Sequence, residues 1–281
     1  MRMKKVLFIA HHRLDRAPGQ RYRFEQYFSY LEDNGVVCDL KNIISEEDDK
    51  ILYSHGNYLK KAAIGLKSLR KRKSDLKSIS QYDLVVVFRE AILTSSIFFE
   101  KRLAKSGVAI LFDFDDAIWI KDISEGNQRL SFLKNPDKIK KILPLVSHVT
   151  AGNSYLKDFA LKYNKNVTII PSTIDTLKYR QLRIRNNEVI TIGWVGSHTT
   201  IKHFETIVPV LIKLKEKYEE KIDFKVIGDP VYYNSDLAIN GMAWDNSKEV
   251  EFFNMLDIGV MPLPEDEWTK GKCGMKGLLY M

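Results

Sequence analysis

The chain has 281 residues, long enough for two domains of ordinary size. Hydrophobic residues make up 44% of it and charged residues 28%, which excludes a disordered chain and predicts a folded, soluble protein. The net charge of +8 predicts an anionic partner, which nucleic acid, a lipid surface or a phosphorylated small molecule could provide.

The opening apolar run, Val6–Ala10, is too short for a signal-peptide core or a membrane span, and no other run reaches membrane-spanning length. Cys38 and Cys273 stand far apart, without the spacing of a disulfide framework or a zinc site. The cysteine usage favours a reducing cytoplasm. The lack of a membrane-spanning run restricts any membrane contact to the bilayer surface.

Short apolar runs rich in β-branched residues indicate buried parallel strands, and helix-length segments separate them. In the first part of the chain these runs lie at 6–10, 36–40, 84–88, 108–112, 146–151 and 167–171. Residues 21–34 carry aromatic and leucine side chains at helical spacing, and Gly35 follows as a helix C-cap. This alternation predicts an α/β sheet.

The same alternation begins again at residue 189. Its predicted elements are strands at 189–195, 224–228 and 258–262 and helices at 201–220 and 248–255. The stretch 175–188 is polar and basic, as interdomain linkers are. We therefore predict two α/β domains, 1–184 and 185–281. The second is predicted to be incomplete, because the chain stops at Met281 in the first turns of a helix.

The first candidate site is the loop 193–200, between a predicted strand and a predicted helix. Gly196 would let the backbone approach a ligand closely, and the helix N-terminus would favour a phosphate. Ser197 could cap the helix or donate to a phosphate oxygen. A capped turn without a ligand is an equally good interpretation, since the loop matches neither the dinucleotide nor the Walker A pattern.

The second candidate site is the loop 262–276, which follows the last predicted strand at the sheet edge where open α/β folds bind ligands. Lys272 and Lys276 are four residues apart and would share a face if the loop opens a helix. Two ammonium groups could then bind a diphosphate. Taken alone, such a loop is more often a solvated charged loop.

The third candidate site is the segment 112–119, which carries Asp113, Asp115 and Asp116 after a predicted strand. Carboxylates there could act as a base or bind sugar hydroxyls, or they could simply cap a helix. Asp113 and Asp115 also form a D-x-D pattern, which leaves open a metal-dependent transferase of the GT-A type. The second series of elements from residue 189 argues against that alternative.

Two basic segments predict further partners. Residues 11–23 form the first strand-to-helix loop, and their His12, Arg21 and Arg23 suit an anionic or hydroxyl-rich acceptor. Residues 60–77 predict an amphipathic basic helix that could lie on an anionic membrane, where a lipid-linked acceptor would also be found. Each segment could instead be a solvated basic surface.

In this order the motifs resemble glycosyltransferase family 4 and its relatives, which are retaining enzymes with two Rossmann-like domains, the GT-B architecture. The resemblance covers nearly the whole chain. It rests on the arginine-rich first loop and on the segments 112–119, 151–156, 170–175, 192–197 and 257–276.

The resemblance implies transfer of a sugar, with retention, from a nucleotide-diphosphate sugar to a glycan or lipid-linked acceptor in cell-envelope polysaccharide synthesis, at the inner face of the cell membrane. The first domain would bind the acceptor and the second the donor, with no metal and no cofactor. Asp115, which lies where many relatives have a cleft histidine, and its neighbour Asp116 would be the catalytic residues. Lys272 and Lys276, with Lys202 as a weaker candidate, would bind phosphates.

Two departures limit what the resemblance implies. Many relatives have a glutamate pair where this chain has Gly271 and Leu279, and an arginine where it has Trp194. The donor-sugar and ribose contacts therefore do not transfer, and the activity of this chain is left open. A non-catalytic α/β nucleotide-binding protein stays an alternative. A nucleic-acid binder is disfavoured, because the sequence shows no nucleic-acid motif and its aromatic residues lie mostly within apolar runs.

Overall fold

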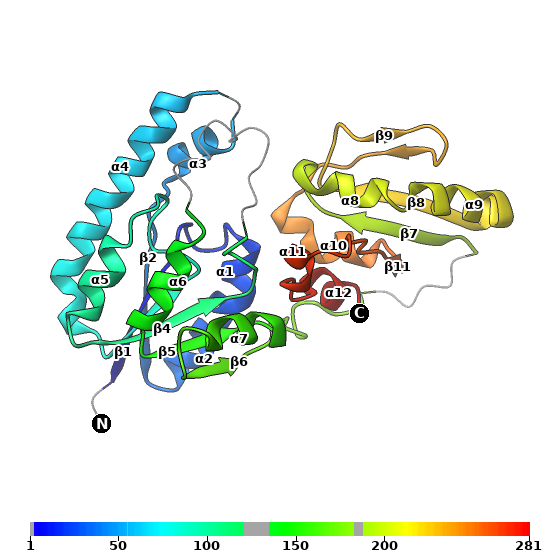
Figure 1. Cartoon of the computed structure of the whole chain (residues 1–281). Helices are drawn as coiled ribbons and strands as arrows, with labels where there is room; N and C mark the ends of the chain where they lie inside the picture. Colours follow the sequence, from blue (N-terminus) through cyan, green and yellow to red (C-terminus); the bar gives the residue numbers. More distant parts are fainter. Residues whose placement is uncertain (1–2, 55, 121–134, 183–187) are drawn as a thin grey trace. The chain divides into compact units, whose positions relative to one another are not determined.

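The computed structural model describes residues 3–54, 56–120, 135–182 and 188–281, and the chain divides into two compact units. Unit one comprises Met1–Ser172 and Lys270–Cys273, and unit two comprises Thr173–Thr269 and Gly274–Met281 (Figure 1). In the described part of the chain, no helix is both long enough and apolar enough to cross a membrane.

Unit one is built on a six-stranded parallel sheet. In order across the sheet, the strands are β2 (Val36–Lys41), β1 (Lys4–Ile9), β3 (Leu84–Phe88), β4 (Ala109–Phe114), β5 (His148–Ala151) and β6 (Val167–Ile169). Every strand predicted for this part of the sequence is present. The predicted α/β fold is thereby confirmed for unit one. The prediction succeeded because continuous apolar runs are typical of strands buried on both faces.

Seven α-helices of unit one lie in the described residues. They are α1 (Pro18–Arg23), α2 (Phe28–Asp33), α3 (Glu46–Leu52), α4 (Tyr58–Asp75), α5 (Phe98–Ala104), α6 (Lys138–Ile142) and α7 (Ser154–Leu161). The prediction of one helix over 21–34 is wrong. Phe24 leaves the helical conformation at φ −147°, and its ring stacks on Phe8 of β1 at 5.0 Å between centroids.

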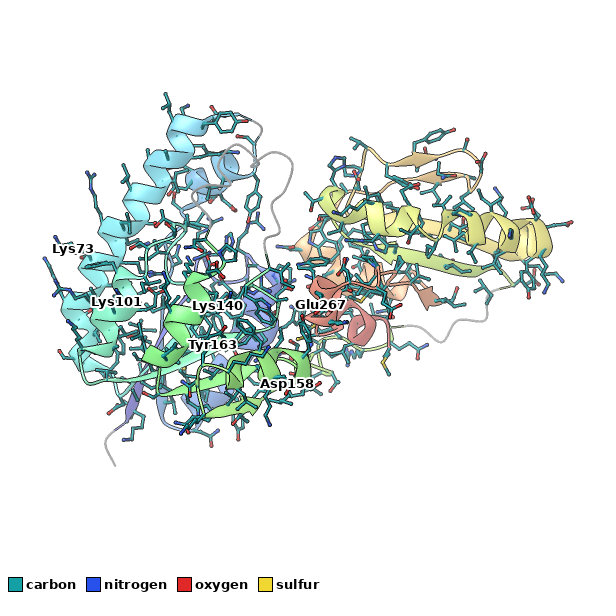
Figure 2. The ribbon with its side chains drawn as sticks, in the orientation of Figure 1. Lys73, Lys101, Lys140, Asp158, Tyr163 and Glu267 are labelled. Carbon is teal, nitrogen blue, oxygen red and sulfur yellow. The ribbon has the colours of Figure 1, made fainter. Side chains whose placement is uncertain are left out.

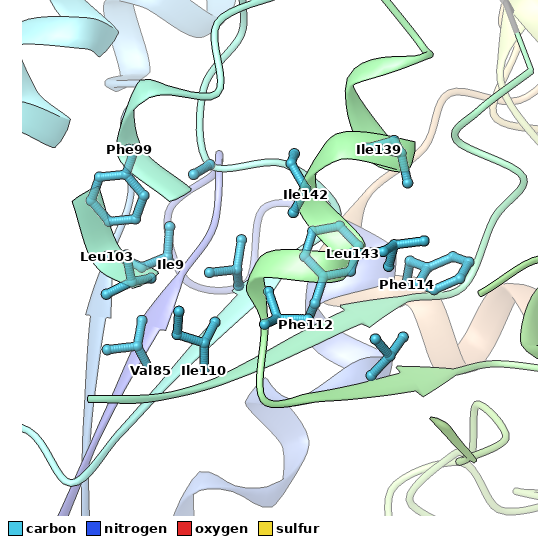
Figure 3. Packing of buried hydrophobic residues seen from close by; sticks show 14 of the residues in the cluster. Ile9, Val85, Phe99, Leu103, Ile110, Phe112, Phe114, Ile139, Ile142 and Leu143 are labelled. Carbon is cyan, nitrogen blue, oxygen red and sulfur yellow. The ribbon is translucent and has the colours of Figure 1, made fainter. Parts of the chain in front are cut away.

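Alternate residues of the central strands pack on opposite faces of the sheet. Leu7 and Val85 belong to the larger core, which the helices α5 and α6 cover with Phe99 and Ile139 (Figure 3). Phe8, Val86 and Phe88 belong to the other face, where they pack with Phe24. Covering both faces leaves only the strand ends and their loops for ligands.

Unit two is built on a three-stranded parallel sheet, which confirms the second predicted α/β series. The strands in order are β11 (Ile258–Gly259), β7 (Ile190–Val195) and β8 (Ile222–Ile227). The helices are α8 (Ile201–Glu205), α9 (Val208–Tyr218), α10 (Glu249–Asn254), α11 (Glu267–Lys270) and α12 (Met275–Tyr280).

Two features of unit two differ from the sequence prediction. The predicted helix over 201–220 is divided into α8 and α9, and Pro209 occupies the first turn of α9, where its missing N–H needs no partner. An antiparallel hairpin of β9 (Tyr233–Asn234) and β10 (Ile239–Asn240) was not predicted. Its two-residue strands are too short to show a hydrophobic pattern.

The predicted domain boundary between residues 184 and 185 falls within 183–187, which lie outside the described residues, so it stays a prediction. The predicted incompleteness of the second domain also stays a prediction. The described residues just before the boundary pack in unit two. Tyr179 donates from Oη to Oε2 of the buried Glu249 at 2.7 Å, and the Asn254 side chain accepts from the backbone N of Leu182 at 2.8 Å.

A buried arginine of α4 ties together three strand ends in unit one. The Arg72 side chain is fully buried, and its guanidinium donates to the carbonyls of Ala10 after β1 at 2.7 Å, Lys41 of β2 at 3.0 Å and Ala91 after β3 at 2.8 Å. It also pairs with Asp75 at 2.8 Å. Each of these carbonyls would lose a buried partner if the guanidinium were absent.

We predict that Arg72→Ala lowers the free energy of unfolding of unit one by roughly 3–5 kcal/mol, because it leaves Asp75 and the strand-end carbonyls without their buried partner. Urea denaturation followed by circular dichroism measures this loss. The control is Arg70→Ala on the exposed side of the same helix, which should change stability by less than about 0.5 kcal/mol. Equal stability of the two variants would contradict the assignment.

Candidate functional site

The carboxyl end of β4 carries the three aspartates of the segment 112–119. Asp113 is the penultimate residue of the strand, and Asp115 and Asp116 follow it. The neighbouring strand β3 ends next to them, since Phe88 is in register with Asp113. Parallel strands place these residues at one edge of the sheet.

Asp113 and Arg23 form a buried, two-pronged ion pair. Arg23 donates from Nε to Asp113 at 3.0 Å and from Nη2 to the other carboxylate oxygen, and its Nη1 donates to the carbonyl of Ile170. The Thr150 hydroxyl also donates to Asp113. The side chains of Arg23 and Asp113 are only 2% and 9% exposed, respectively. The pair therefore joins α1 to β4 and β5, and the predicted contact of Arg23 with an acceptor stays a prediction.

Asp115 is paired with an arginine that the sequence analysis did not single out. Arg89 follows β3 directly and has a left-handed backbone, with φ 58°, which is uncommon for a residue with a side chain. Its Nε donates to Asp115 at 2.7 Å, and its Nη2 lies 3.9 Å from an Asp116 oxygen. The only sequence signal for Arg89 is a charge placed immediately after a buried strand.

Asp115 is held in its charged form. Burial on its own would raise the pKa of Asp115, but the charge of Arg89 and its hydrogen bond lower that pKa below the ordinary value. An anion at this place can stabilise positive charge that develops on a bound substrate. A general base with a pKa near neutrality is a poorer description of this group.

The segment Lys270–Cys273 packs on this edge of unit one. The Lys272 ammonium lies 2.8 Å from an Asp116 oxygen, and the Cys273 thiol donates to the carbonyl of Asp115 at 3.3 Å. The Asn153 amide donates to the carbonyls of Lys270 and Lys272, each at 3.2 Å. Asp116, like Asp115, therefore has a cationic partner.

Close packing against glycine holds the same segment. A Cβ on Gly152 would lie 2.3 Å from the sulfur of Cys273, and a Cβ on Gly271 would lie 2.6 Å from the Cβ of Ala117. Burial, helped by the charge of Asp115, raises the pKa of Cys273 to about 12, so the partly buried thiol is neutral.

His12 lies in a cluster around Asp49 of α3. Its Nδ1 is 3.9 Å from Asp49, Arg13 approaches the same carboxylate at 3.7 Å, and Arg16 forms an ion pair with it. Burial lowers the pKa of His12, although Asp49 acts to raise it. The third predicted acceptor residue, Arg21, has its guanidinium carbon 5.2 Å from the ring centre of Tyr22.

The structure places Lys272 and Lys276 in different units. Gly274, at φ 67°, turns the chain and precedes α12, so Lys272 lies before the helix and Lys276 within it. The two lysines do not share a helix face, and their joint binding of one diphosphate depended on a shared face.

In unit two, Gly196 follows β7 and lies against Lys276. A Cβ on Gly196 would be 2.9 Å from the Lys276 nitrogen and 2.2 Å from the Trp194 ring, so glycine is required here. The Lys276 ammonium lies 4.9 Å from the centre of that buried ring, within cation–π range. Backbone and ammonium thus meet at the carboxyl end of β7, and ligands of open α/β folds bind at such strand ends.

The residues after Gly196 form a braced turn. Ser197 and Thr200 make a reciprocal capping box, and the Ser197 hydroxyl lies 2.9 Å from that of Thr199. Ser197 therefore has the capping role that the sequence allowed, and its role toward phosphate stays a prediction. Lys202 is exposed on α8.

No metal site emerges from the described residues, in which no three His, Cys, Asp or Glu side chains gather closely enough to hold an ion. The D-x-D pattern is divided in the structure. Asp113 is used by Arg23 and Asp115 by Arg89.

We predict that Arg89→Gln raises the pKa of Asp115 and lowers the free energy of unfolding at neutral pH by about 1–3 kcal/mol, since a largely buried carboxylate, 12% exposed, loses its cation. Because the pKa of Asp115 is lowered in the fold, its stabilising contribution is complete above the unfolded value of 3.8 and is lost as the pH falls through the folded value. The difference in free energy of unfolding between the wild-type chain and Arg89→Gln should therefore shrink on acidification.

Carboxyl-detected NMR titration measures the pKa of Asp115, and urea denaturation at several pH values measures the stability difference. Arg102→Gln, at an exposed position of α5, removes the same charge from unit one and is the control. An unchanged pKa of Asp115 in Arg89→Gln would refute the role of Arg89.

Comparison with known proteins identifies the fold. No protein-family model matches the chain, and no curated protein matches it in sequence. Among solved structures, an α,α-trehalose-phosphate synthase (UDP-forming) from Burkholderia vietnamiensis has a TM-score of 0.57 at 11% identity, covering 97% of this chain and 81% of its own. WaaG, a glycosyltransferase involved in lipopolysaccharide biosynthesis, has a TM-score of 0.56 at 13% identity, covering 98% and 78%.

A third structure, an α-glucosyltransferase in complex with UDP and a 13-mer DNA, has a TM-score of 0.54 at 13% identity, covering 92% of this chain and 71% of its own. Identities this low establish the fold and leave the activity to be argued from the site. The chain has the GT-B fold, with two α/β units that are each built on a parallel sheet.

Proposed function

We propose that the chain is a glycosyltransferase that moves a sugar from a nucleotide-diphosphate sugar to an acceptor with retention of configuration. The observation that carries the proposal is the meeting of Gly196 and Lys276 in unit two. A glycine backbone and an ammonium group there flank the end of a parallel strand. Nucleotide phosphates bind at such strand ends in open α/β folds, and the fold is one that glycosyltransferases share.

The proposed reaction separates charge, and the two units carry groups of opposite sign, an anion in unit one and a cation in unit two. The bond between the anomeric carbon and a diphosphate oxygen breaks, a bond to the acceptor oxygen forms on the same face of the sugar, and the acceptor proton leaves with the diphosphate. Lys276 neutralises the leaving diphosphate in place of a metal. Asp115, charged through Arg89, stabilises the positive charge at the anomeric carbon, with Asp116 as the alternate.

Two other functions compete with this proposal. A non-catalytic nucleotide-binding protein would use the same phosphate site without sugar transfer. A metal-dependent transferase using Asp113 and Asp115 would need both carboxylates for the ion. The present ion pairs with Arg23 and Arg89 favour the proposal over that second alternative.

We predict that UDP or GDP binds the chain equally well with and without Mn²⁺, and that Lys276→Met weakens the binding by about tenfold or more, since a charged hydrogen bond to phosphate is lost. Isothermal titration calorimetry measures both effects. Lys213→Met, at an exposed position of α9, removes the same charge from unit two and should leave the affinity unchanged. Binding that requires Mn²⁺ would contradict the proposed role of Lys276.

Turnover separates the enzyme from a non-catalytic binder. Release of UDP or GDP from nucleotide sugars, through slow hydrolysis by water, needs no knowledge of the acceptor. The proposal expects this release to fall by at least about tenfold in Asp115→Asn, because a charge that stabilises the transition state is removed. Tight nucleotide binding with no release from any nucleotide sugar would favour the non-catalytic alternative.

For the acceptor, we propose a lipid-linked molecule reached by contact of the 60–77 segment with an anionic membrane. The helix α4 buries Ile64 and Ser68 against unit one and exposes Leu59 and Leu66, which are 89% and 59% accessible. Its other exposed residues are mainly basic, and Lys73 projects from the outer side of the helix (Figure 2). Exposed leucines between basic residues are typical of helices that lie on anionic bilayers.

The same membrane contact would place the protein at the inner face of the cell membrane and would suit cell-envelope polysaccharide synthesis. A cytoplasmic location belongs to this proposal. The absence of nucleic-acid binding stays a prediction. The DNA in the α-glucosyltransferase complex is a property of that protein.

We predict salt-sensitive binding of the chain to vesicles containing phosphatidylglycerol, measured by co-sedimentation. Each basic residue near a charged surface contributes about 1 kcal/mol, so reversal of three should weaken binding by about 100-fold or more. The variant combines Lys60→Glu, Arg70→Glu and Lys73→Glu, all at exposed positions of α4.

The matched control reverses three exposed charges in unit two, namely Lys213→Glu, Lys217→Glu and Lys221→Glu. It changes the net charge by the same amount. Equal loss of binding in both variants would show that net charge, and not the α4 surface, drives the association.

A further inference from the structure

The loops after β7 and β8 carry a histidine–aspartate pair in unit two. The Nδ1 of His198 lies 2.9 Å from Oδ2 of Asp229. The two partners differ sharply in burial, since the His198 side chain is 75% exposed and the Asp229 side chain only 2%. A buried carboxylate thus holds an imidazole that projects largely into solvent.

Backbone packing fixes both loops. Val195 and Ile227 are paired at the ends of neighbouring parallel strands, and the N–H of Gly196 donates to Ile227 at 2.9 Å. Gly228 has φ +107°, and a Cβ there would lie 1.9 Å from the carbonyl oxygen of Gly196. The loops therefore touch, and the pair sits at the strand ends beside Gly196.

Asp229 is held from several sides. Its Oδ1 accepts from the N–H of Val231 at 3.4 Å, its carbonyl accepts from Tyr232 at 3.2 Å, and a Cβ on Gly241 would lie 2.0 Å from that carbonyl. A carboxylate oxygen can only accept, so Nδ1 of His198 carries the proton of their bond. The ring nitrogen that remains for a ligand is Nε2.

The charges around His198 point to an anionic ligand. A ring that donates from Nδ1 to Asp229 can also donate from Nε2 only when both nitrogens carry protons, and a phosphate oxygen is an acceptor that suits such a ring. The Lys276 ammonium lies against Gly196, two residues before His198. A smaller side chain such as serine or asparagine could also donate a hydrogen bond to Asp229. The exposed imidazole of His198 is therefore more than that hydrogen bond needs.

We propose that His198 donates from Nε2 to a phosphate oxygen of a bound nucleoside diphosphate, and that Asp229 is the positioning residue that orients its ring. The inference rests on the proposed function and adds a second hydrogen-bond donor to the Gly196–Lys276 site. His198 supplies a directed donor from the loop after β7, whereas Lys276 approaches from α12.

The test uses UDP and uridine as probes of the wild-type chain and its variants, with uridine measured by competition against UDP, or GDP and guanosine if only GDP binds. His198→Ala should weaken the affinity for the nucleoside diphosphate by about tenfold and leave the affinity for the nucleoside unchanged, because only the diphosphate offers a phosphate oxygen. Asp229→Asn should weaken the affinity for the nucleoside diphosphate when His198 is present. In the double variant, which combines Asp229→Asn with His198→Ala, it should have no further effect.

The matched control is His148→Ala in unit one. His148 begins β5, and its ring contacts Thr168 of β6. It should bind UDP like the wild type. Thermal unfolding checks that the Asp229→Asn variant folds. The His198 side chain is exposed, so His198→Ala should keep the fold and test the contact with phosphate by itself.

Unchanged UDP affinity in His198→Ala would overturn the inference and leave the proposed function standing. Equal weakening of UDP and uridine would also overturn it, since His198 would then contact the nucleoside. If neither UDP nor GDP binds the wild-type chain, the proposed function itself fails and the inference fails with it.

Discussion

The buried guanidinium of Arg72 is the interaction on which the loop edge of unit one depends. It comes from a helix, yet its hydrogen bonds end on carbonyls at the ends of β1 and β2 and beyond β3. Removing a charge from water is costly, and the hydrogen bonds and Asp75 offset that cost only while the geometry is kept. The strand ends are therefore held in one arrangement, from which the polar loops project.

A second buried arginine extends this order across the sheet. Arg23 joins α1 to β4 through Asp113 and reaches the chain beyond β6 through the carbonyl of Ile170. Arg89 then orients Asp115, and Lys272 pairs with Asp116. The carboxylates at this edge thus have distinct tasks, because one is buried with Arg23 and the other two stay partly accessible.

The elements that the sequence predicted are those whose pattern is local. A short run rich in β-branched residues such as Leu84–Phe88 is typical of a buried strand, and both sheets followed from such runs. The divisions within 21–34 and 201–220 were missed for different reasons. Pro209 was visible in the sequence, whereas the departure of Phe24 from the helix depends on its packing against Phe8.

The candidate site was less predictable, because its pairings join distant parts of the chain. Arg23 and Asp113 are 90 residues apart, and Asp116 and Lys272 are 156 apart. The sequence singled out all four residues, but it could not show that they would neutralise one another. Arg89 and the pair His198–Asp229 were missed as partners for the same reason.

We expect one nucleoside diphosphate to bind unit two, at the carboxyl ends of its parallel strands. A crystal structure of the chain with UDP, or with GDP if only GDP binds, would locate it. The diphosphate should lie beside Gly196 and Lys276, where a strand end, a glycine and an ammonium group meet. A diphosphate bound instead through a metal ion at Asp113 and Asp115 would contradict this expectation.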